Sequence, residues 1–313
     1  MIALFQTIAG LCILYFGGET LVRGAVALAS RLGLSSLAIG LTVVAFGTSA
    51  PELAVSLNAA MNNASDISLG NVIGSNIANI GLILGLSAVI SPLVVQAKII
   101  RMDAPIMITS MLLAVVFLLD NQISRLEGLI LATALIAYIA FTFLQARKEP
   151  ELVQEEYLQG IPQSRGRLAI DLGLIFLGLG LLIAGGKLLV MAAVSIALLF
   201  GMSEAVIGLT IVALGTSLPE LTATLVAARR GYGDIAIGNI IGSNIFNVLG
   251  ILGITALITP LQTGNILWAD IICMVLLCLL TYLFLFSRSK VERYEGILLV
   301  LLYIAYCSWL IVR

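Results

Sequence analysis

Residues 39–93 read IGLTVVAFGTSAPELAVSLNAAMNNASDISLGNVIGSNIANIGLILGLSAVISPL, and residues 207–261 read IGLTIVALGTSLPELTATLVAARRGYGDIAIGNIIGSNIFNVLGILGITALITPL. The two stretches align without a gap at a constant offset of 168 residues, and 32 of the 55 aligned positions are identical. The same offset pairs Gly17-Gly18 with Gly185-Gly186, and Glu127-Gly128 with Glu295-Gly296. Chance does not produce such agreement, so the sequence predicts an internal repeat covering nearly the whole chain.

The composition is that of a chain whose solvent is largely lipid. Of the 313 residues, 60% are hydrophobic and 11% are charged, and the mean hydropathy is +1.14. A soluble domain is about 45–50% apolar and about 25% charged. The net charge is −1 and no basic stripe exists, so a nucleic-acid partner is not expected. The four cysteines lie in apolar stretches without metal-site spacing, and no obligate protein partner is indicated.

Ten apolar runs are long enough to cross a bilayer, for which a helix needs about 20 mostly apolar residues. They lie near 2–29, 36–61, 68–90, 103–119, 125–145, 168–199, 204–228, 236–258, 267–286 and 294–312. The one long polar break falls at the middle of the chain. The sequence therefore predicts an all-α polytopic membrane protein with a first five-helix repeat at 1–145, a linker at 146–167 and a second repeat at 168–313.

The basic residues between these expected helices predict the orientation in the membrane. If the N-terminus is outside, the inside connections carry twelve Lys or Arg residues and the outside connections carry only Arg125 and Arg313, which is a strong positive-inside bias. The twelve are Arg31, Lys98, Arg101, Arg147, Lys148, Arg165, Arg167, Arg229, Arg230, Arg288, Lys290 and Arg293. Both termini are therefore expected outside and the 146–167 linker in the cytoplasm, with the protein in a prokaryotic-type cell (inner) membrane.

An odd number of helices in each repeat makes the two repeats cross the membrane in opposite senses. Inverted repeats of this kind are a transporter architecture, in which the substrate site lies near the bilayer midplane at the repeat interface. The segments that agree best between the halves are therefore the candidates for the site.

Two pairs of motifs stand out within the apolar runs. Gly47-Thr48-Ser49-Ala50-Pro51-Glu52 corresponds to Gly215-Thr216-Ser217-Leu218-Pro219-Glu220, and GNVIGSNIAN at 70–79 corresponds to GNIIGSNIFN at 238–247. A carboxylate inside a spanning helix is costly unless it faces a cavity or a partner. No basic residue lies within a turn of Glu52 or Glu220, so we expect the two glutamates to bind cations.

Proline and the neighbouring polar residues supply the remaining oxygen atoms. Pro51 and Pro219 fall in mid-helix, where proline leaves the carbonyl four residues earlier without its hydrogen bond. Ser49 shares a helix face with Glu52, and Ser75 shares one with Asn79, as do Ser243 and Asn247. The glycines at 70, 74, 238 and 242 are expected to let these helices approach closely. Asn71, Asn76, Asn239 and Asn244 are interpreted as interhelical hydrogen-bonding residues.

All of these ligands are oxygen atoms, which hard cations prefer. The two glutamates carry a charge of −2, which one Ca²⁺ or two Na⁺ would neutralise, and a third Na⁺ would need neutral oxygens. Such a site could exchange the two ions, because empty buried carboxylates are costly. No cofactor is expected, and an enzyme is not expected because a nucleophile–base pair is missing.

Other charged residues have structural interpretations. Asp66 and Asp234 are expected to be helix N-caps, and Glu19 is expected to pair with Arg23 four residues later. Lys187 occupies the position of Glu19 in the second half and is interpreted as structural.

The paired G-T-S-x-P-E and G-N-x-x-G-S-N motifs make the chain resemble the Ca²⁺/cation antiporter superfamily, and within it the prokaryotic sodium/calcium exchangers. The resemblance covers nearly the whole chain and implies ten helices, with the second, third, seventh and eighth around the site. It implies Ca²⁺ binding by Glu52, Glu220 and the backbone carbonyls of Thr48 and Thr216. It implies Na⁺ binding by Ser49, Ser75, Ser217 and Ser243, the carbonyls of Ala45 and Ala213, and Asn79, Asn247 and the same two glutamates. It further implies sliding of the first and sixth helices past the others.

The expected function is therefore a secondary antiporter that exchanges Na⁺ for Ca²⁺ and uses the sodium gradient to extrude calcium. Some relatives carry Asp where this chain has Asn247, which argues against a potassium requirement here. A proton/calcium or other divalent-cation antiporter on the same scaffold is the nearest alternative, and both serine pairs favour sodium over it. A cation channel is a weaker alternative, since its flux would need no counter-ion gradient.

Overall fold

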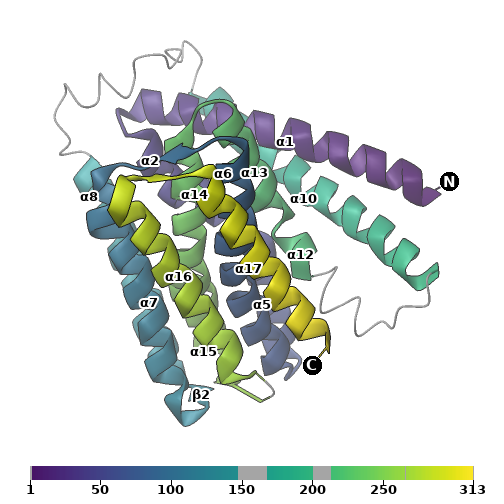
Figure 1. Ribbon diagram of the computed structural model, residues 1–313, viewed down its shortest axis with the longest axis vertical. Helices are drawn as coiled ribbons and strands as arrows, with labels where there is room; N and C mark the ends of the chain where they lie inside the picture. The colour runs from purple at the N-terminus through teal and green to yellow at the C-terminus, as the bar shows by residue number, and fades with distance from the viewer. Residues whose placement is uncertain (1, 147–167, 200–212, 265, 313) are drawn as a thin grey trace.

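The computed structural model describes residues 2–146, 168–199, 213–264 and 266–312, and these residues are mostly helical (Figure 1). The first half contains α1 (Ile2–Leu32), α2 (Ser36–Ile39), α3 (Ala45–Thr48), α4 (Ala50–Met61), α5 (Ser65–Ala78), α6 (Gly85–Ile90), α7 (Ala104–Phe117) and α8 (Arg125–Ala146). The second half contains α10 (Leu168–Leu199), α12 (Ala213–Thr216), α13 (Leu218–Arg229), α14 (Gly233–Ile245), α15 (Gly253–Ile258), α16 (Trp268–Arg288) and α17 (Arg293–Val312).

Short segments of other helical types join several of these helices. Four are π-helical: η1 (Gly40–Val44), η2 (Asn79–Leu84), η3 (Ile99–Asp103) and η6 (Phe246–Leu252). One, η4 (Leu118–Asp120), is a 3₁₀-helix. Through these segments α5 continues into α6, and α14 continues into α15. Each of these two expected spans is therefore one nearly continuous helix.

Eight helices in the described residues are long and apolar enough to cross a membrane, and a ninth is counted if Ser36–Thr48 and Ala50–Met61 form one bent span. These nine correspond to nine of the ten predicted spans. Of the tenth, expected near 204–228, only the part from Ala213 onward lies within the described residues, as α12 and α13. Residues 147–167 of the expected linker also lie outside them.

Proline breaks the helix beside each glutamate, as the sequence predicts. The bend between the segments that end at Thr48 and begin at Ala50 is 44°. Ser49 lies at the break with φ −83° and ψ 5°, and Pro51 is in the first turn of α4. In the second half, Ser217 precedes α13 with φ −88° and ψ 5°, and Pro219 is in the first turn of α13. Proline has no N–H, so neither Pro51 nor Pro219 can donate to the carbonyl four residues earlier.

Two short antiparallel ladders join the halves. β1 (Leu93–Val94) pairs with β4 (Lys290–Val291), and β2 (Gln122–Ile123) pairs with β3 (Leu261–Gln262). The 168-residue offset maps β1 onto β3 and β2 onto β4, so each ladder joins one connector from each half. Figure 1 shows β2 at one end of the molecule and the turn from α16 into α17, which contains β4, at the other.

The last helix of each half also packs against the other half. α8 packs on η6 and α15, and α17 packs on η2 and α6. A Cβ at Gly128 would lie 2.8 Å from the carbonyl oxygen of Gly253, and a Cβ at Gly296 would lie 2.6 Å from that of Gly85. Only glycine permits such close backbone contact. The two contacts are related by the same offset.

The helix pair α1 and α10 forms a separate layer. Figure 1 shows these long helices side by side, at a steep angle to the remaining helices. Arg31 of α1 is joined to Asp171 of α10 by an ion pair, with 2.5 Å between Arg31 Nε and Asp171 Oδ2.

The predicted close approach at the motif glycines is confirmed on one side. A Cβ at Gly242 would lie 2.6 Å from the carbonyl oxygen of Leu41, and a Cβ at Gly238 would lie 3.0 Å from that of Leu37. The residues that the offset places opposite Gly70 and Gly74, around 205–209, lie outside the described residues.

The predictions for the peripheral carboxylates need correction. Asp66 and Asp234 are not N-caps, because α5 begins at Ser65 and α14 at Gly233, which places both carboxylates within the first helical turn. There they still oppose the positive end of the helix dipole.

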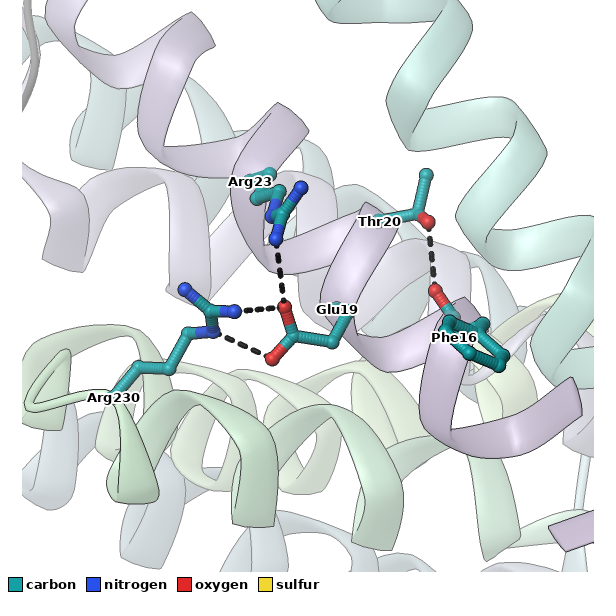
Figure 2. A network of polar contacts seen from close by, with 5 residues as sticks. All are labelled: Phe16, Glu19, Thr20, Arg23 and Arg230. Atoms are coloured by element: carbon teal, nitrogen blue, oxygen red, sulfur yellow. Dashed lines mark hydrogen bonds and ion pairs between the residues drawn. The ribbon is translucent and has the colours of Figure 1, made fainter. Parts of the chain in front are cut away.

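The predicted Glu19–Arg23 pair is confirmed, with 3.4 Å between the carboxylate and the guanidinium, but Arg230 is a second and closer partner of Glu19 (Figure 2). Lys187, which has the position of Glu19 in the second half, is exposed.

Candidate functional site

Glu52 and Glu220 are buried carboxylates that lie where the two halves of the chain meet. Glu52 is 1% exposed and Glu220 is 2% exposed. Each lies in the first turn of the helix that follows a proline break, α4 for Glu52 and α13 for Glu220. The free N–H groups of a helical first turn favour negative charge, which lowers part of the cost of burying these groups.

The serines of the two breaks make hydrogen bonds that cross between the halves. Ser49 Oγ donates to Glu220 Oε1 at 3.0 Å, and Ser217 Oγ donates to Glu52 Oε1 at 3.1 Å. Ser217 Oγ also lies 3.5 Å from Ser75 Oγ of α5. Ser49 therefore bonds to the glutamate of the other half and not to Glu52 of its own half. The crossed bonds bring both glutamates to one common site.

The second oxygen of each carboxylate lacks a partner. Glu52 Oε2 and Glu220 Oε2 are buried and have no hydrogen-bond partner among the described residues. A buried charge that is not neutralised is strongly unfavourable. The described residues contain no group of three or more His, Cys, Asp or Glu side chains, so the charge of this centre is that of the two glutamates.

Neutral oxygen atoms of the second motif pair are in the same condition. Asn79 Oδ1, Ser243 Oγ and Asn247 Oδ1 are buried without a hydrogen-bond partner in the described part of the chain. Asn79 begins η2 and Asn247 lies in η6, so both asparagines belong to π-helical segments. Single π-helical turns are frequent at functional sites.

Thr48 and Ala45 are buried next to the break. Thr48 ends α3, and its Oγ1 donates to Asn239 Oδ1 at 3.2 Å. The carbonyl of Ala45 accepts a hydrogen bond from the N–H of Ser49 at 3.0 Å, and Thr48 Oγ1 lies 3.4 Å from the same oxygen.

Their counterparts are the ends of α12. Thr216 ends that helix and is half-buried, and Ala213 begins it.

Asn71 and Asn239 support the backbone of the two glutamates, in agreement with their interpretation as interhelical hydrogen-bonding residues. Asn71 Nδ2 donates to the carbonyl of Glu52 at 3.1 Å and to Ser56 Oγ at 2.9 Å. Asn239 Nδ2 donates to the carbonyl of Glu220 at 3.4 Å and to Thr224 Oγ1 at 2.9 Å. The two arrangements are equivalent under the 168-residue offset.

Asn76 and Asn244 behave differently from that interpretation. Asn76 Nδ2 donates to the carbonyl of Val72, and Asn244 Nδ2 donates to that of Ile240, each four residues earlier in its own helix. Ser56 and Thr224, which accept hydrogen bonds from the two asparagines that support the glutamates, lie outside the two motifs that indicated the site. The signal was present, because both carry a hydroxyl at equivalent positions of the repeat.

The arrangement can hold a desolvated cation chemically. It offers two carboxylates from opposite halves, hydroxyl and amide oxygens around them, and the carbonyls at two helix breaks to which proline cannot donate. Oxygen ligands of this kind suit Ca²⁺ and Na⁺.

Comparison with known proteins gives a family for the whole chain. The sequence model described as "Sodium/calcium exchanger protein" matches residues 2–144 and 170–312. The "Sodium/calcium exchanger MaX1" of Methanosarcina acetivorans is 36% identical, over 95% of each chain. The "Putative antiporter CaxA" of Alkalimonas amylolytica is 37% identical, over 98% of each chain.

Solved structures agree with this result. The sodium-calcium exchanger NCX_Mj soaked with 100 mM Na⁺ and 10 mM Sr²⁺ has a TM-score of 0.85 at 35% identity, over 98% of each chain. The same exchanger soaked with 10 mM Na⁺ and zero Ca²⁺ has a TM-score of 0.86 at 36% identity. With matches to both halves of the repeat, this chain belongs to the sodium/calcium exchanger family.

Proposed function

We propose that this protein is a secondary antiporter that exchanges Na⁺ for Ca²⁺ across the membrane and extrudes calcium at the expense of the sodium gradient. The observation that carries the proposal is the pair of buried carboxylates, Glu52 and Glu220, each with one oxygen atom that has no partner in the described chain. Its relatives include a protein named as a sodium/calcium exchanger and one solved with Na⁺ and Sr²⁺.

Glu52 and Glu220 would bind Ca²⁺ together with the backbone carbonyls of Thr48 and Thr216. The Na⁺ sites would use these glutamates with a set of neutral ligands, which are Ala45, Ser49, Ser75, Asn79, Ala213, Ser217, Ser243 and Asn247. The crossed bonds of Ser49 and Ser217 support this assignment, since they place hydroxyl oxygens beside both carboxylates.

Exchange follows from the charge of the site. One Ca²⁺ or two Na⁺ neutralise the two carboxylates, and a site left without ions keeps two unpaired charges in a low-dielectric core. The protein therefore changes its accessible side readily only when loaded. A third Na⁺ on neutral oxygens would make each cycle move net charge.

The proposed architecture is ten helices in two inverted repeats, with both termini outside and the 146–167 linker in the cytoplasm. Two observations support it. The two ladders, and the Gly128–Gly253 and Gly296–Gly85 contacts, join one half to the other at equivalent positions. Twelve basic residues fall in the connections expected inside and two in those expected outside.

The test is Ca²⁺ uptake by proteoliposomes loaded with Na⁺ and diluted into Na⁺-free buffer. We expect uptake that requires internal Na⁺ and that is lost in Glu52→Gln, which keeps the shape of the side chain but removes its charge. Uptake driven equally by a proton gradient without Na⁺ would indicate the proton antiporter instead. Uptake that needs no counter-ion at all would contradict antiport and indicate a channel.

A further inference from the structure

Glu19 is a buried carboxylate outside the ion site. It lies in α1 and is 8% exposed. Both of its oxygens accept hydrogen bonds from the guanidinium of Arg230, and the Nε–Oε1 distance is 2.5 Å. Figure 2 shows Arg230 approaching from below α1 while Arg23, on α1 itself, reaches the same carboxylate. The two-point Arg230 contact fixes direction as well as distance.

This ion pair connects α1 to the helix that carries Glu220. Arg230 is the C-cap residue directly after α13, and Glu220 is in the first turn of that helix. Along the same interface Gly18 brings α1 close to α13, since a Cβ at Gly18 would lie 3.0 Å from Val226 Cγ2. Beside this apolar glycine contact, the Glu19–Arg230 pair is a charged contact between α1 and the end of α13.

A second ion pair makes α1 and α10 one unit. Arg31 and Asp171 join these helices, and Asp171 is 2% exposed. Gly178 adds close backbone packing, since a Cβ there would lie 2.5 Å from the N atom of Leu21. The α1–α10 pair is therefore held together internally, and the bond from Glu19 to Arg230 attaches it to the helices of the site.

The Glu19–Arg230 pair joins the two halves, and the described residues at its symmetry-related positions form no such pair. The 168-residue offset places Lys187 at the position of Glu19 and Asn62 at the position of Arg230. Lys187 is exposed, and the side-chain amide of Asn62 donates to Asn58 of its own helix at 2.8 Å. In a transporter built from inverted repeats, the two access states exchange the environments of the halves. An ion pair whose counterpart under the 168-residue offset is missing would therefore stabilise only one of these states.

We propose that Glu19 and Arg230 are positioning residues of the exchange cycle, whose ion pair holds α13 and Glu220 against α1 in one access state and is released in the other. The proposal rests on the proposed Na⁺/Ca²⁺ exchange. It assigns the pair a role in the balance between states and none in binding ions.

The test compares the two faces of the membrane. Right-side-out and inside-out vesicles give the apparent KM for Ca²⁺ on each side for the wild type and for Glu19→Gln. We expect the ratio of the two KM values to change about fivefold, as for an ion pair between the exposed and fully buried extremes. A purely structural loss would reduce the number of active molecules, and therefore the maximal rate, without changing this ratio.

Two further variants make the test specific. Lys187→Gln removes a charge at the equivalent position of the other half and should leave the ratio unchanged. Exchanging the charges in Glu19→Arg with Arg230→Glu should restore the wild-type ratio. An unchanged ratio in Glu19→Gln, with Na⁺-dependent uptake intact in the wild type, would overturn the positioning role alone. Absence of Na⁺-dependent uptake in the wild type would overturn the proposed function and this role with it.

Discussion

At the scale of single residues, the site depends on hydrogen bonds that cross from one half to the other. Ser49 and Ser217 each bind the glutamate of the opposite half, so neither half can form the centre alone. Each serine occupies one carboxylate oxygen and leaves the other without a partner. The two serine hydroxyls orient the carboxylates and carry no charge themselves. The total charge of the site therefore stays that of the two glutamates.

Asn239 should matter more than its neighbour Asn244, although both are fully or almost fully buried amides on α14. Asn239 joins Thr48, Thr224 and the carbonyl of Glu220, so Asn239→Ala leaves buried groups without partners. We expect the half-saturating Ca²⁺ concentration to rise about tenfold, because each such loss costs about 1–3 kcal/mol.

Asn244→Ala is the matched control, because the Asn244 amide donates only within its own helix, and it should change Ca²⁺ affinity far less. Uptake measured over a range of Ca²⁺ concentrations separates the two variants. Equal effects of both substitutions would mean that Asn239 acts through general packing and not through the backbone of Glu220.

At the scale of elements, the helices around the two glutamates are interrupted where the proposed ligands lie. Prolines interrupt two of these helices beside the glutamates. In two others the helix becomes π-helical, at Asn79 in η2 and around Asn247 in η6. A regular helix uses every carbonyl internally and would offer only side chains to an ion. Interruptions at membrane depth are tolerated where they line a cavity or a site.

Pro51→Ala should impair exchange while leaving the fold at least as stable. Alanine restores an N–H that can bond to the carbonyl of Gly47, which straightens the break between α3 and α4 and removes a carbonyl from the site. We expect the exchange rate to fall about tenfold or more, which corresponds to roughly 1.4 kcal/mol. The rate of Na⁺-driven uptake and the thermal unfolding midpoint are measured together.

Pro105→Ala is the control for this substitution. Pro105 lies in the first turn of α7, outside the ion site, and its replacement by alanine should keep exchange intact. If Pro51→Ala also exchanged at the wild-type rate, the proline break would be a packing feature without a role in ligand supply.

At the scale of the whole molecule, the repeat explains how much could be predicted from sequence. The spans, the proline breaks and the burial of Glu52 and Glu220 follow from local pattern and from agreement between the halves, because both copies must satisfy the same physical demands. The Glu19–Arg230 pair could not be found in that way. Its members are 211 residues apart, and the repeat places Lys187 and Asn62 at their equivalent positions, so only the packing of α1 on α13 reveals the pair.

The charge of the centre predicts the electrical behaviour of the complete cycle. Asn247 is neutral, so the empty site carries −2 and one Ca²⁺ or two Na⁺ neutralise it. A third Na⁺ bound by neutral oxygens would give the sodium-loaded form one positive charge. Uptake of Ca²⁺ into Na⁺-loaded proteoliposomes then moves positive charge outward. We expect an inside-positive potential, set with valinomycin and a K⁺ gradient, to accelerate uptake and an inside-negative potential to slow it.

In Asn247→Asp the extra carboxylate would make the sodium-loaded form neutral and the calcium-loaded form negative. Voltage would then act on the calcium step instead, while each cycle would still move the same net charge. Uptake indifferent to potential in the wild type would mean that only two Na⁺ exchange for each Ca²⁺, and the neutral oxygens around Ser243 and Asn247 would then have a role other than holding a further ion.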